Sequence, residues 1–526
     1  MNSPERSDRD APAYAQPREL VQSSPSLQDQ ETAPTALQMV AIDLRSRANS
    51  NQLQEFLTAP DDFRRFKIWF GEETLRKRLA DSAAWVADQL DRDMASIDRL
   101  IENQLNAILH AKQFQKLESA WRGVEYLVDK RDEHAGAPIS IKVLNVSWIE
   151  LRNDVEAAIE FDQSQMFRKI YEEGLGTPGA DPFSVLIADF AIHPRPSREH
   201  PADDLFILSS LSQVAAAAFC PLIVNADPSM FGSDSFSDLR PTVNVESLHA
   251  GLDYFSWQRF RETEESRFVS LALPKMLMRR PYRDRYDLGF PFRETVRSRD
   301  DYLWGGAAFA MGEVLLRAFA ESRWLANIRG AQRGSESGGV VTGPASDPFT
   351  TEPHENAIKS MTDILIPDEF ERELASCGFL PLCPCKDMPM GAFFSCVSAQ
   401  KPKQYNSVEA TINARLSSLL NYVLCVSRFA HYLKIIARDR IGSCATPEEL
   451  QSLLQTWITE YVSPDPDAGL STRARRPLID AEVRVRPLPG TAGEYGCVLH
   501  LSPHYQLDDM RVSIRLDTQL AQPSRT

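Results

Sequence analysis

The densest group of potential ligands in the chain is a set of four cysteines, Cys377, Cys383, Cys385 and Cys396. Four thiolates can bind a structural zinc ion, but such sites usually take their cysteines as closely spaced pairs. This group contains a single C-x-C pair and two isolated cysteines. The spacing therefore favours buried, reduced thiols, and we predict no metal site.

A glycine-rich segment, GAQRGSESGGVVTGP (residues 330–344), is the next candidate for chemistry. It fits neither the G-x-x-x-x-G-K-[ST] phosphate loop nor the G-x-G-x-x-G dinucleotide motif, and no predicted strand leads into it. The chain also lacks the H-E-x-x-H and G-x-S-x-G patterns of metalloproteases and hydrolases. We therefore predict a flexible surface loop, with no cofactor site and no catalytic residue.

His431 lies in the helical segment FAHYLK, close to Arg428 and Lys434. A histidine that acts as a general base needs a nucleophile or an acid within reach, and the sequence offers none. We therefore interpret His431 as a partly buried structural histidine.

The one local basic stretch contains Arg473, Arg475 and Arg476, and it continues to Arg484 and Arg486. Acidic residues interrupt it, which makes contact with nucleic acid a poor interpretation. Arg475 and Arg476 are better candidates for contact with an acidic protein surface.

The formal net charge of −15 gives the chain an average field that repels nucleic acids and anionic membranes. The opening residues contain no apolar signal segment, and no apolar run approaches the ~20 residues that span a bilayer. We expect a protein of the bacterial cytoplasm that inserts into no membrane and binds no nucleic acid.

The organisation of the chain begins with a stretch rich in Ser, Pro and Gln (residues 1–60), which we predict to be a flexible tail with one ordered piece at Leu37–Leu44. Residues 61–135 are predicted to be helical, because apolar residues recur at helical spacing in three successive segments. Those positions are Leu75, Leu79, Val86 and Leu90; then Ile97, Leu100, Ile101, Leu105 and Ile108; then Phe114, Leu117, Trp121, Val124 and Leu127.

Residues 136–380 are predicted to form an α/β core. The apolar run 183–190 indicates a buried strand, 202–218 a helix and 221–224 a second strand, and this order implies a parallel pair. Before them, 139–146 alternates like a strand, and Ser147 with Glu150 indicates a capping box at a helix start. Further helices are expected at 266–278, 304–325 and 367–374.

Residues 381–526 combine helices with strands. Asn406 with Glu409, and Thr446 with Glu449, indicate two helix starts. Alternating apolar and polar residues at 481–487, 496–501 and 510–516 predict half-exposed antiparallel strands. The predicted fold class is thus mixed α/β (α+β), with a helical layer at the N-terminus, a core with a parallel strand pair, and antiparallel strands near the C-terminus.

Eight segments resemble, in the same order, the large sheath subunit of type VI secretion systems, the TssC (VipB, EvpB) family. They are FQKLESAWRGVEYLV (114–128), YEEGLGTPGADPFSVLIADF (171–190), ESRFVSLALPKMLMRRPY (265–282), YLWGGAAFAM (302–311), WLANIRG (324–330), SRFAHYLKIIARDRIG (427–442), ARRPLIDAEVRVRPLPGTAGEY (474–495) and LSPHYQLD (501–508). The resemblance covers residues 60–516, and it implies a contractile tail-sheath-like fold.

The resemblance implies a structural protein that is not an enzyme. A member of this family pairs with a small sheath subunit (TssB- or VipA-like), and copies of the heterodimer stack in a helical sheath around an inner tube of Hcp-like protein. The sheath meets a baseplate, its contraction expels the tube, and a ClpV-type ATPase dismantles it. Neighbouring subunits are joined by exchanged strands.

Within the matched motifs, the candidate assembly residues are Trp121, Arg122, Arg267, Arg280, His431, Arg475, Arg476, Val483 and Val485. Contacts that hold the fold of a single subunit are the competing interpretation for most of them. Val483 and Val485 lie in a predicted strand, where proline would remove ladder pairing and so test strand exchange.

Two alternatives stay open. The first is a diverged sheath-like paralogue with an accessory or end-specific role, because Gly179–Ala180 and Ala188–Phe190 depart from the family pattern. The second is an enzyme of unknown type that uses the α/β core, which would require a deep pocket with converging titratable groups.

Overall fold

The computed structural model describes residues 50–73, 83–177, 179–198, 200–283, 290, 292–331, 336–352, 355–386, 388–440, 446–465, 468–487 and 495–504. The chain divides into two units, Met1–Ala107 and Ile108–Thr526. The predictions for Leu37–Leu44, Leu75, Leu79 and residues 510–516 fall outside the described residues.

The first unit contains the helices α2 (Ser50–Thr58), α3 (Asp62–Phe70) and most of α5 (Ala83–Leu109). The Asp61 carboxylate caps α3 by accepting a hydrogen bond from the backbone N–H of Arg64 at 2.7 Å. The helix ends at Gly71, whose φ of 78° favours glycine. Aromatic contacts hold these helices together, with the rings of Phe56 and Trp69 5.4 Å apart.

The second unit is built around a four-stranded parallel sheet with the order β1-β2-β3-β9. Its strands are β1 (Leu186–Ile192), β2 (Leu222–Ala226), β3 (Val269–Leu273) and β9 (Phe379–Pro381). β2 and β3 are buried along their whole length, as expected for parallel strands covered on both faces. The predicted parallel pair of β1 and β2 is confirmed, and α9 (Asp204–Ala217) connects these two strands.

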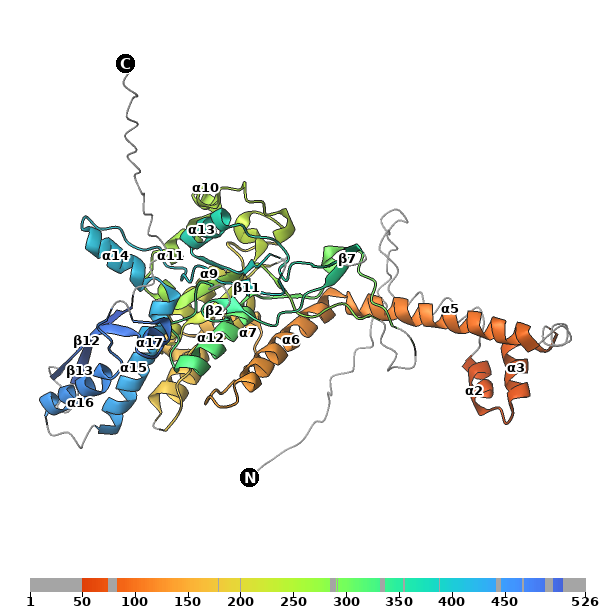
Figure 1. The fold of residues 1–526 in the computed structure, drawn as a ribbon, viewed down its shortest axis with the longest axis horizontal. Helices are drawn as coiled ribbons and strands as arrows, with labels where there is room; N and C mark the ends of the chain where they lie inside the picture. The colour runs from red at the N-terminus through yellow and green to blue at the C-terminus, as the bar shows by residue number, and fades with distance from the viewer. Residues whose placement is uncertain are drawn as a thin grey trace, which may run out of the picture. The chain divides into compact units, whose positions relative to one another are not determined.

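Two hydrophobic clusters cover the two faces of this sheet. Figure 1 shows strand β2 of the sheet between the helices α9 and α12. On one face, Val224 and Leu271 pack in a cluster with Trp257 of α11 (Phe255–Arg261) and with residues of α9 and α13 (Asp368–Ser376). On the other face, Ile223 packs in a cluster with Met311 of α12 (Ala308–Ser322). The remaining core elements are α7 (Trp148–Ala157), α8 (Gln165–Phe167), the π-helix η2 (Arg168–Gly176), α10 (Val245–His249), β4 (Met276–Leu277), β5 (Trp304–Gly305), β6 (Val340–Val341), β7 (Pro348–Glu352), β8 (Glu355–Ile358), β10 (Cys383–Pro384) and β11 (Gly391–Ala392).

The helix α6 (Lys112–Glu133) packs closely against α12, and the glycine of its Trp-Arg-Gly motif makes this possible. A Cβ atom added at Gly123 would lie 2.4 Å from the ring of Phe309, so no larger residue fits without displacing that ring. The motif glycine therefore serves helix packing within the subunit.

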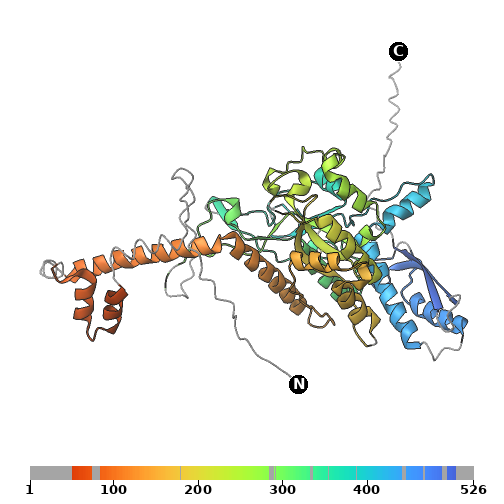
Figure 2. The ribbon, with the colours of Figure 1, turned by 180° about the vertical axis from the view of Figure 1, so that it is seen from behind.

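The C-terminal elements form a third cluster around Trp324 and Phe429, whose rings stack 4.1 Å apart. Its residues come mainly from α15 (Leu420–Arg440), α16 (Pro447–Thr459) and the antiparallel strands β12 (Leu478–Pro487) and β13 (Tyr495–Pro503). The helices α14 (Val408–Ser417) and α17 (Leu470–Arg475) belong to the same part of the chain. Figure 2 shows α15, α16 and the two strands, coloured blue, grouped at one side of this unit. The predicted strands at 481–487 and 496–501 are confirmed.

Several local predictions are wrong. Residues 139–146 form no strand, because no other described segment lies alongside to complete a ladder. Residues 266–278 contain the central strand β3 instead of a helix, since an unbroken apolar run suits a buried strand as well as a helix. The predicted helices around Val86–Leu90 and Ile97–Ile108 are one continuous helix, α5.

Candidate assembly surfaces

The β12–β13 hairpin is the candidate site for joining this chain to another. Val483 and Val485 of β12 are buried, with 1% and 9% exposure, and they pack in the cluster that also contains α16. Their backbone N–H groups donate to the side-chain oxygens of Gln455 (2.8 Å) and Gln451 (2.9 Å) on α16. The Gln455 amide also donates to the carbonyl oxygen of Ala481 at 2.9 Å. The outer edge of β12 is thus occupied by glutamine side chains.

The same bonds fix which groups of β13 face outward. In antiparallel pairs, opposed residues point their N–H and C=O groups either toward each other or both away. Val483 lies opposite Leu499 and Val485 opposite Cys497, and both valine N–H groups point away from β13. The backbone groups of Leu499 and Cys497 therefore face the outer edge of β13. Within the described part of the chain, no third strand pairs with that edge.

A second segment, residues 138–147, pairs with no strand in the described part of the chain. Residues 138–147 connect α6 to α7 without regular secondary structure. Val143 is 65% exposed, although valine favours strands, and the apolar Leu144 is 49% exposed. The following helix is firmly fixed, because Ser147 and Glu150 form the predicted capping box, with the Ser147 N–H donating to the Glu150 carboxylate at 2.7 Å.

A stripe of exposed apolar residues runs along α6. Phe114, Leu117 and Trp121 recur at helical spacing and are 37%, 58% and 65% exposed. Trp121 thus lies on the solvent-exposed side of α6, whereas its neighbour Gly123 packs against α12. Trp121 is therefore largely exposed in the single subunit, and its role in assembly stays a prediction.

Arg122 and Arg280 lie near each other at a small surface hollow that both residues line with Tyr126 and Pro344. Arg122 donates to the Glu125 carboxylate at 2.8 Å and to the Tyr282 hydroxyl at 3.2 Å. These contacts tie α6 to the segment after β4. Arg122 therefore has a role within the subunit, while Arg280 is exposed.

Arg267 and His431 make local contacts. Arg267 donates to the backbone carbonyl of Glu264 at 2.9 Å and pairs with the Glu264 carboxylate. His431 is buried, and its Nε2–H donates to the carbonyl oxygen of Ala218 at 2.8 Å. Burial lowers the pKa of His431, so its imidazole is held neutral. These are the contacts of a structural histidine.

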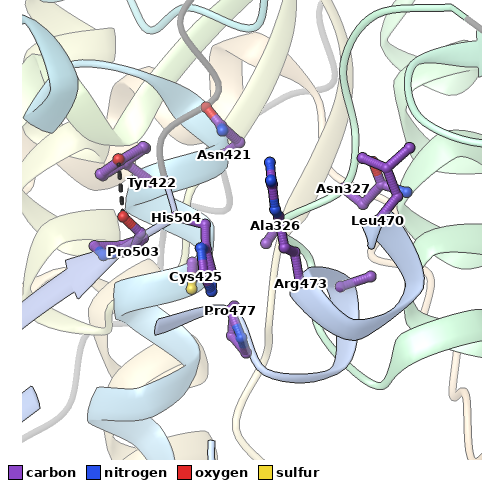
Figure 3. Close-up of a pocket in the computed structure, with 11 residues that line it drawn as sticks. Ala326, Asn327, Asn421, Tyr422, Cys425, Leu470, Arg473, Pro477, Pro503 and His504 are labelled. Atoms are coloured by element: carbon purple, nitrogen blue, oxygen red, sulfur yellow. Dashed lines mark hydrogen bonds between the residues drawn. The ribbon is translucent and has the colours of Figure 1, made fainter. Parts of the chain in front are cut away.

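Arg475 and Arg476 end α17 and are exposed, and among the described residues neither takes part in an ion pair. A cavity of about 30 Å³ lies beside them, between α15, α17 and the ends of the hairpin (Figure 3). The Tyr422 hydroxyl donates across one side of it to the carbonyl oxygen of Pro503 at 3.3 Å. Ligand sites enclose about 300–1,000 Å³, so this cavity holds at most a water molecule.

The two segments that the sequence singled out for chemistry belong to the core. Cys377, Cys383 and Cys396 are buried, and burial raises the pKa of the Cys383 thiol. The prediction of a surface loop is wrong for the C-terminal half of the glycine-rich segment. Gly339 is buried there, and a Cβ atom at this position would lie 2.2 Å from the carbonyl oxygen of Phe393. Residues 332–335 lie outside the described residues.

The structure brings together one group that the sequence did not predict. His193, His200 and Asp204 place their ligand atoms within 4.8 Å of one another, and they are the only such group of three or more among the residues described. The spacing H-x₆-H-x₃-D could have drawn attention to His200 and Asp204, which lie four residues apart, with Asp204 as the first residue of α9. His193 could be added only once the end of β1 was known.

Comparison with known proteins identifies the family. Residues 91–400 match the family model described as "EvpB/VC_A0108, tail sheath N-terminal domain", and residues 409–520 match "EvpB/VC_A0108, tail sheath gpW/gp25-like domain". The chain is 36% identical over 463 residues to the type VI secretion system sheath protein TssC1 of Pseudomonas aeruginosa, covering 85% of this chain and 91% of that protein.

A solved structure, the baseplate of the anti-feeding prophage, has a TM-score of 0.31 and 9% identity over 60% of this chain and 66% of that chain. No helix in the described ranges is both long and apolar enough to cross a membrane. The two family matches and the relative agree over most of the sequence. The chain therefore belongs to the EvpB/VC_A0108 tail sheath family and is a type VI secretion sheath subunit.

Proposed function

We propose that this chain is the structural large subunit of a contractile sheath. It pairs with a small sheath subunit, stacks with copies of itself in a helix around an Hcp-like tube, and expels that tube by contraction in the bacterial cytoplasm. The proposal assigns it no catalytic role. Its membership of the tail sheath family supports this proposal.

One observation carries the proposal, namely the difference between the two outer edges of the β12–β13 hairpin. The edge of β12 is occupied by Gln451 and Gln455, whereas no described strand pairs with the edge of β13 that carries the outward-facing backbone groups of Cys497 and Leu499. An exposed strand edge is a template for a strand from another chain. We propose that a neighbouring subunit adds its strand to the edge of β13. This differs from the expectation that Val483 and Val485 of β12 pair directly with the donated strand.

Strand addition suits a sheath that changes length. Backbone hydrogen bonds between donated strands link subunits strongly, yet the donated strand can be joined to its own subunit by a flexible connection. Rings of subunits can then rotate past one another while the links stay closed. The energy of contraction would be stored in the assembled extended state, since the proposal includes no nucleotide hydrolysis by this chain.

The exposed segment 138–147 and the α6 stripe (Phe114, Leu117 and Trp121) offer further contact area for the small subunit. An incoming strand beside Val143 and Leu144 would pair with the backbone of this segment, and its side chains would pack beside Val143 on one face and beside Leu144 on the other. Burying a large aromatic residue such as Trp121 typically dominates the energy of an interface.

The proposal is tested by co-expressing the full chain with a small sheath subunit and examining the product by negative-stain electron microscopy. Hollow tubes are the expected result. A stable complex without tubes would contradict the main-subunit role and favour an accessory paralogue. Failure of the two proteins to purify together would contradict the proposed pairing.

A further inference from the structure

The residues His193, His200 and Asp204 lie at the carboxyl edge of the parallel sheet. His193 directly follows β1, Asp227 directly follows β2, and Asp204 is the first residue of α9. In open α/β sheets, this edge is where ligands bind, because the loops after neighbouring strands meet there. The chain therefore places polar side chains at a position that suits binding.

The Asp204 carboxylate is the centre of this group, and its side chain has no solvent exposure. One oxygen lies 2.9 Å from Nδ1 of His193, and the other lies 2.7 Å from Nε2 of His200. The two imidazole rings stack face to face with their centroids 4.1 Å apart. Two ring nitrogens from separate positions in the chain thus converge on one carboxylate.

The surroundings resemble the outer shell of a metal site. A metal-bound carboxylate is usually held by further hydrogen bonds, and a metal-bound histidine usually donates its second ring N–H to a carboxylate. Here the Trp148 indole N–H (2.5 Å) and the His193 backbone N–H (3.0 Å) donate to Asp204. Nε2 of His193 lies 3.5 Å from the Asp227 carboxylate.

We propose that His193 (Nδ1), His200 (Nε2) and Asp204 bind one divalent transition-metal ion, with zinc as the best match. Zinc prefers nitrogen and oxygen ligands at about 2.0–2.2 Å, and three protein ligands leave a fourth position for water. The three ligand atoms lie within 4.8 Å of one another. The two imidazole rings are nearly parallel, with an interplanar angle of 17°, so one ring must rotate before both ring nitrogens can point at a single ion.

The ion would enter from solvent, because the side chains of His193 and His200 are 22% and 31% exposed. Once bound, it would fasten the connection between β1 and α9, since its ligands lie at both ends of that connection. The site would add stability to the sheath subunit and is independent of the hairpin edge. The proposal departs from the prediction, made from the cysteine spacing, that the chain has no metal site.

The competing explanation is that the two histidines only donate hydrogen bonds to Asp204. Two substitutions separate these possibilities, because they keep a donor near the position of each ring nitrogen but remove the metal ligand. The Asn amide approximates Nδ1 in His193→Asn, and the Gln amide approximates Nε2 in His200→Gln. The matched control is His500→Ala, an exposed histidine on β13.

The experiment uses the full chain, stripped with a chelator and titrated with Co²⁺ and then Zn²⁺. We expect one equivalent of Co²⁺ with the visible absorption of a low-coordinate site, displacement by Zn²⁺, and a higher thermal midpoint with Zn²⁺. His193→Asn and His200→Gln should each weaken binding at least tenfold and remove the thermal shift, whereas His500→Ala should change neither. Absence of stoichiometric binding, or unchanged binding in both substituted proteins, would overturn the proposal.

Discussion

At the scale of single residues, buried histidines connect the stability of this subunit to pH. His249 is 1% exposed, its Nε2–H donates to the Met230 carbonyl at 2.9 Å, and aromatic rings surround it. Burial lowers its pKa from 6.5 to about 4. The folded protein therefore holds this imidazole neutral at pH values where the unfolded chain protonates it.

The sign of the pH effect follows from this shift. Above pH 6.5 the imidazole is neutral in both states, so His249 adds no pH dependence. Between pH 6.5 and about 4 only the unfolded chain takes up the proton, so we expect the free energy of unfolding to fall, by roughly 3 kcal/mol in total. Denaturant unfolding at a series of pH values measures this slope.

The matched variant is His249→Gln, which keeps an amide donor for Met230 but cannot titrate. The variant should lose the part of the slope that His249 contributes, whatever its absolute stability. An identical slope in the variant and the original protein would show that His249 does not carry the effect.

At the scale of elements, the pairing of α16 with β12 depends on glutamine side chains in place of a strand. Gln455→Ala would leave the Val483 N–H and the Ala481 carbonyl without their partner. Partly buried backbone groups left unpaired cost about 1–3 kcal/mol, and we expect a loss of stability in this range. Thermal or denaturant unfolding measures it.

The control for this prediction is Ser452→Ala, an exposed position on the same helix. It should change the stability by less than about 0.5 kcal/mol. Equal effects of the two substitutions would mean that Gln455 contributes helix propensity alone and does not hold the edge of β12.

Elements whose signals are local could be predicted from the sequence. Thr446 caps α16 as expected, accepting a hydrogen bond from the Glu449 N–H at 3.2 Å, and the alternation at 481–487 gave β12. Elements whose structure depends on neighbouring strands or helices could not be predicted in this way. Residues 139–146 have the pattern of a strand but lack a strand partner in the described chain. Both faces of β3 are buried, so its sequence has no alternation that would distinguish a strand from a buried helix.

The candidate sites follow the same division. The sequence placed Trp121, Val483 and Val485 in the correct elements, but exposure distinguishes the first from the other two. Which edge of the hairpin is open depends on two glutamines of α16, and the grouping of His193 with Asp204 depends on where β1 ends. Such facts require the tertiary structure.

At the scale of the whole molecule, the chain combines a parallel core with a hairpin whose β12 edge is occupied by glutamine side chains and whose β13 edge pairs with no strand of the described residues. The core supplies the body of a sheath subunit, and we propose that the edge of β13 supplies a link to the next one. In this proposal, β13 receives a strand from a neighbouring subunit when the sheath assembles.

The most direct test compares Cys497→Pro with Cys497→Ser during co-expression with a small sheath subunit. Proline removes the outward-facing N–H of Cys497 but none of the N–H groups that face β12, so the hairpin should remain folded. Unchanged circular dichroism and thermal midpoint of the proline variant would verify this. We predict that Cys497→Ser forms sedimentable sheaths and that Cys497→Pro forms few or none. Normal, complete sheaths from a folded Cys497→Pro protein would contradict strand addition at β13.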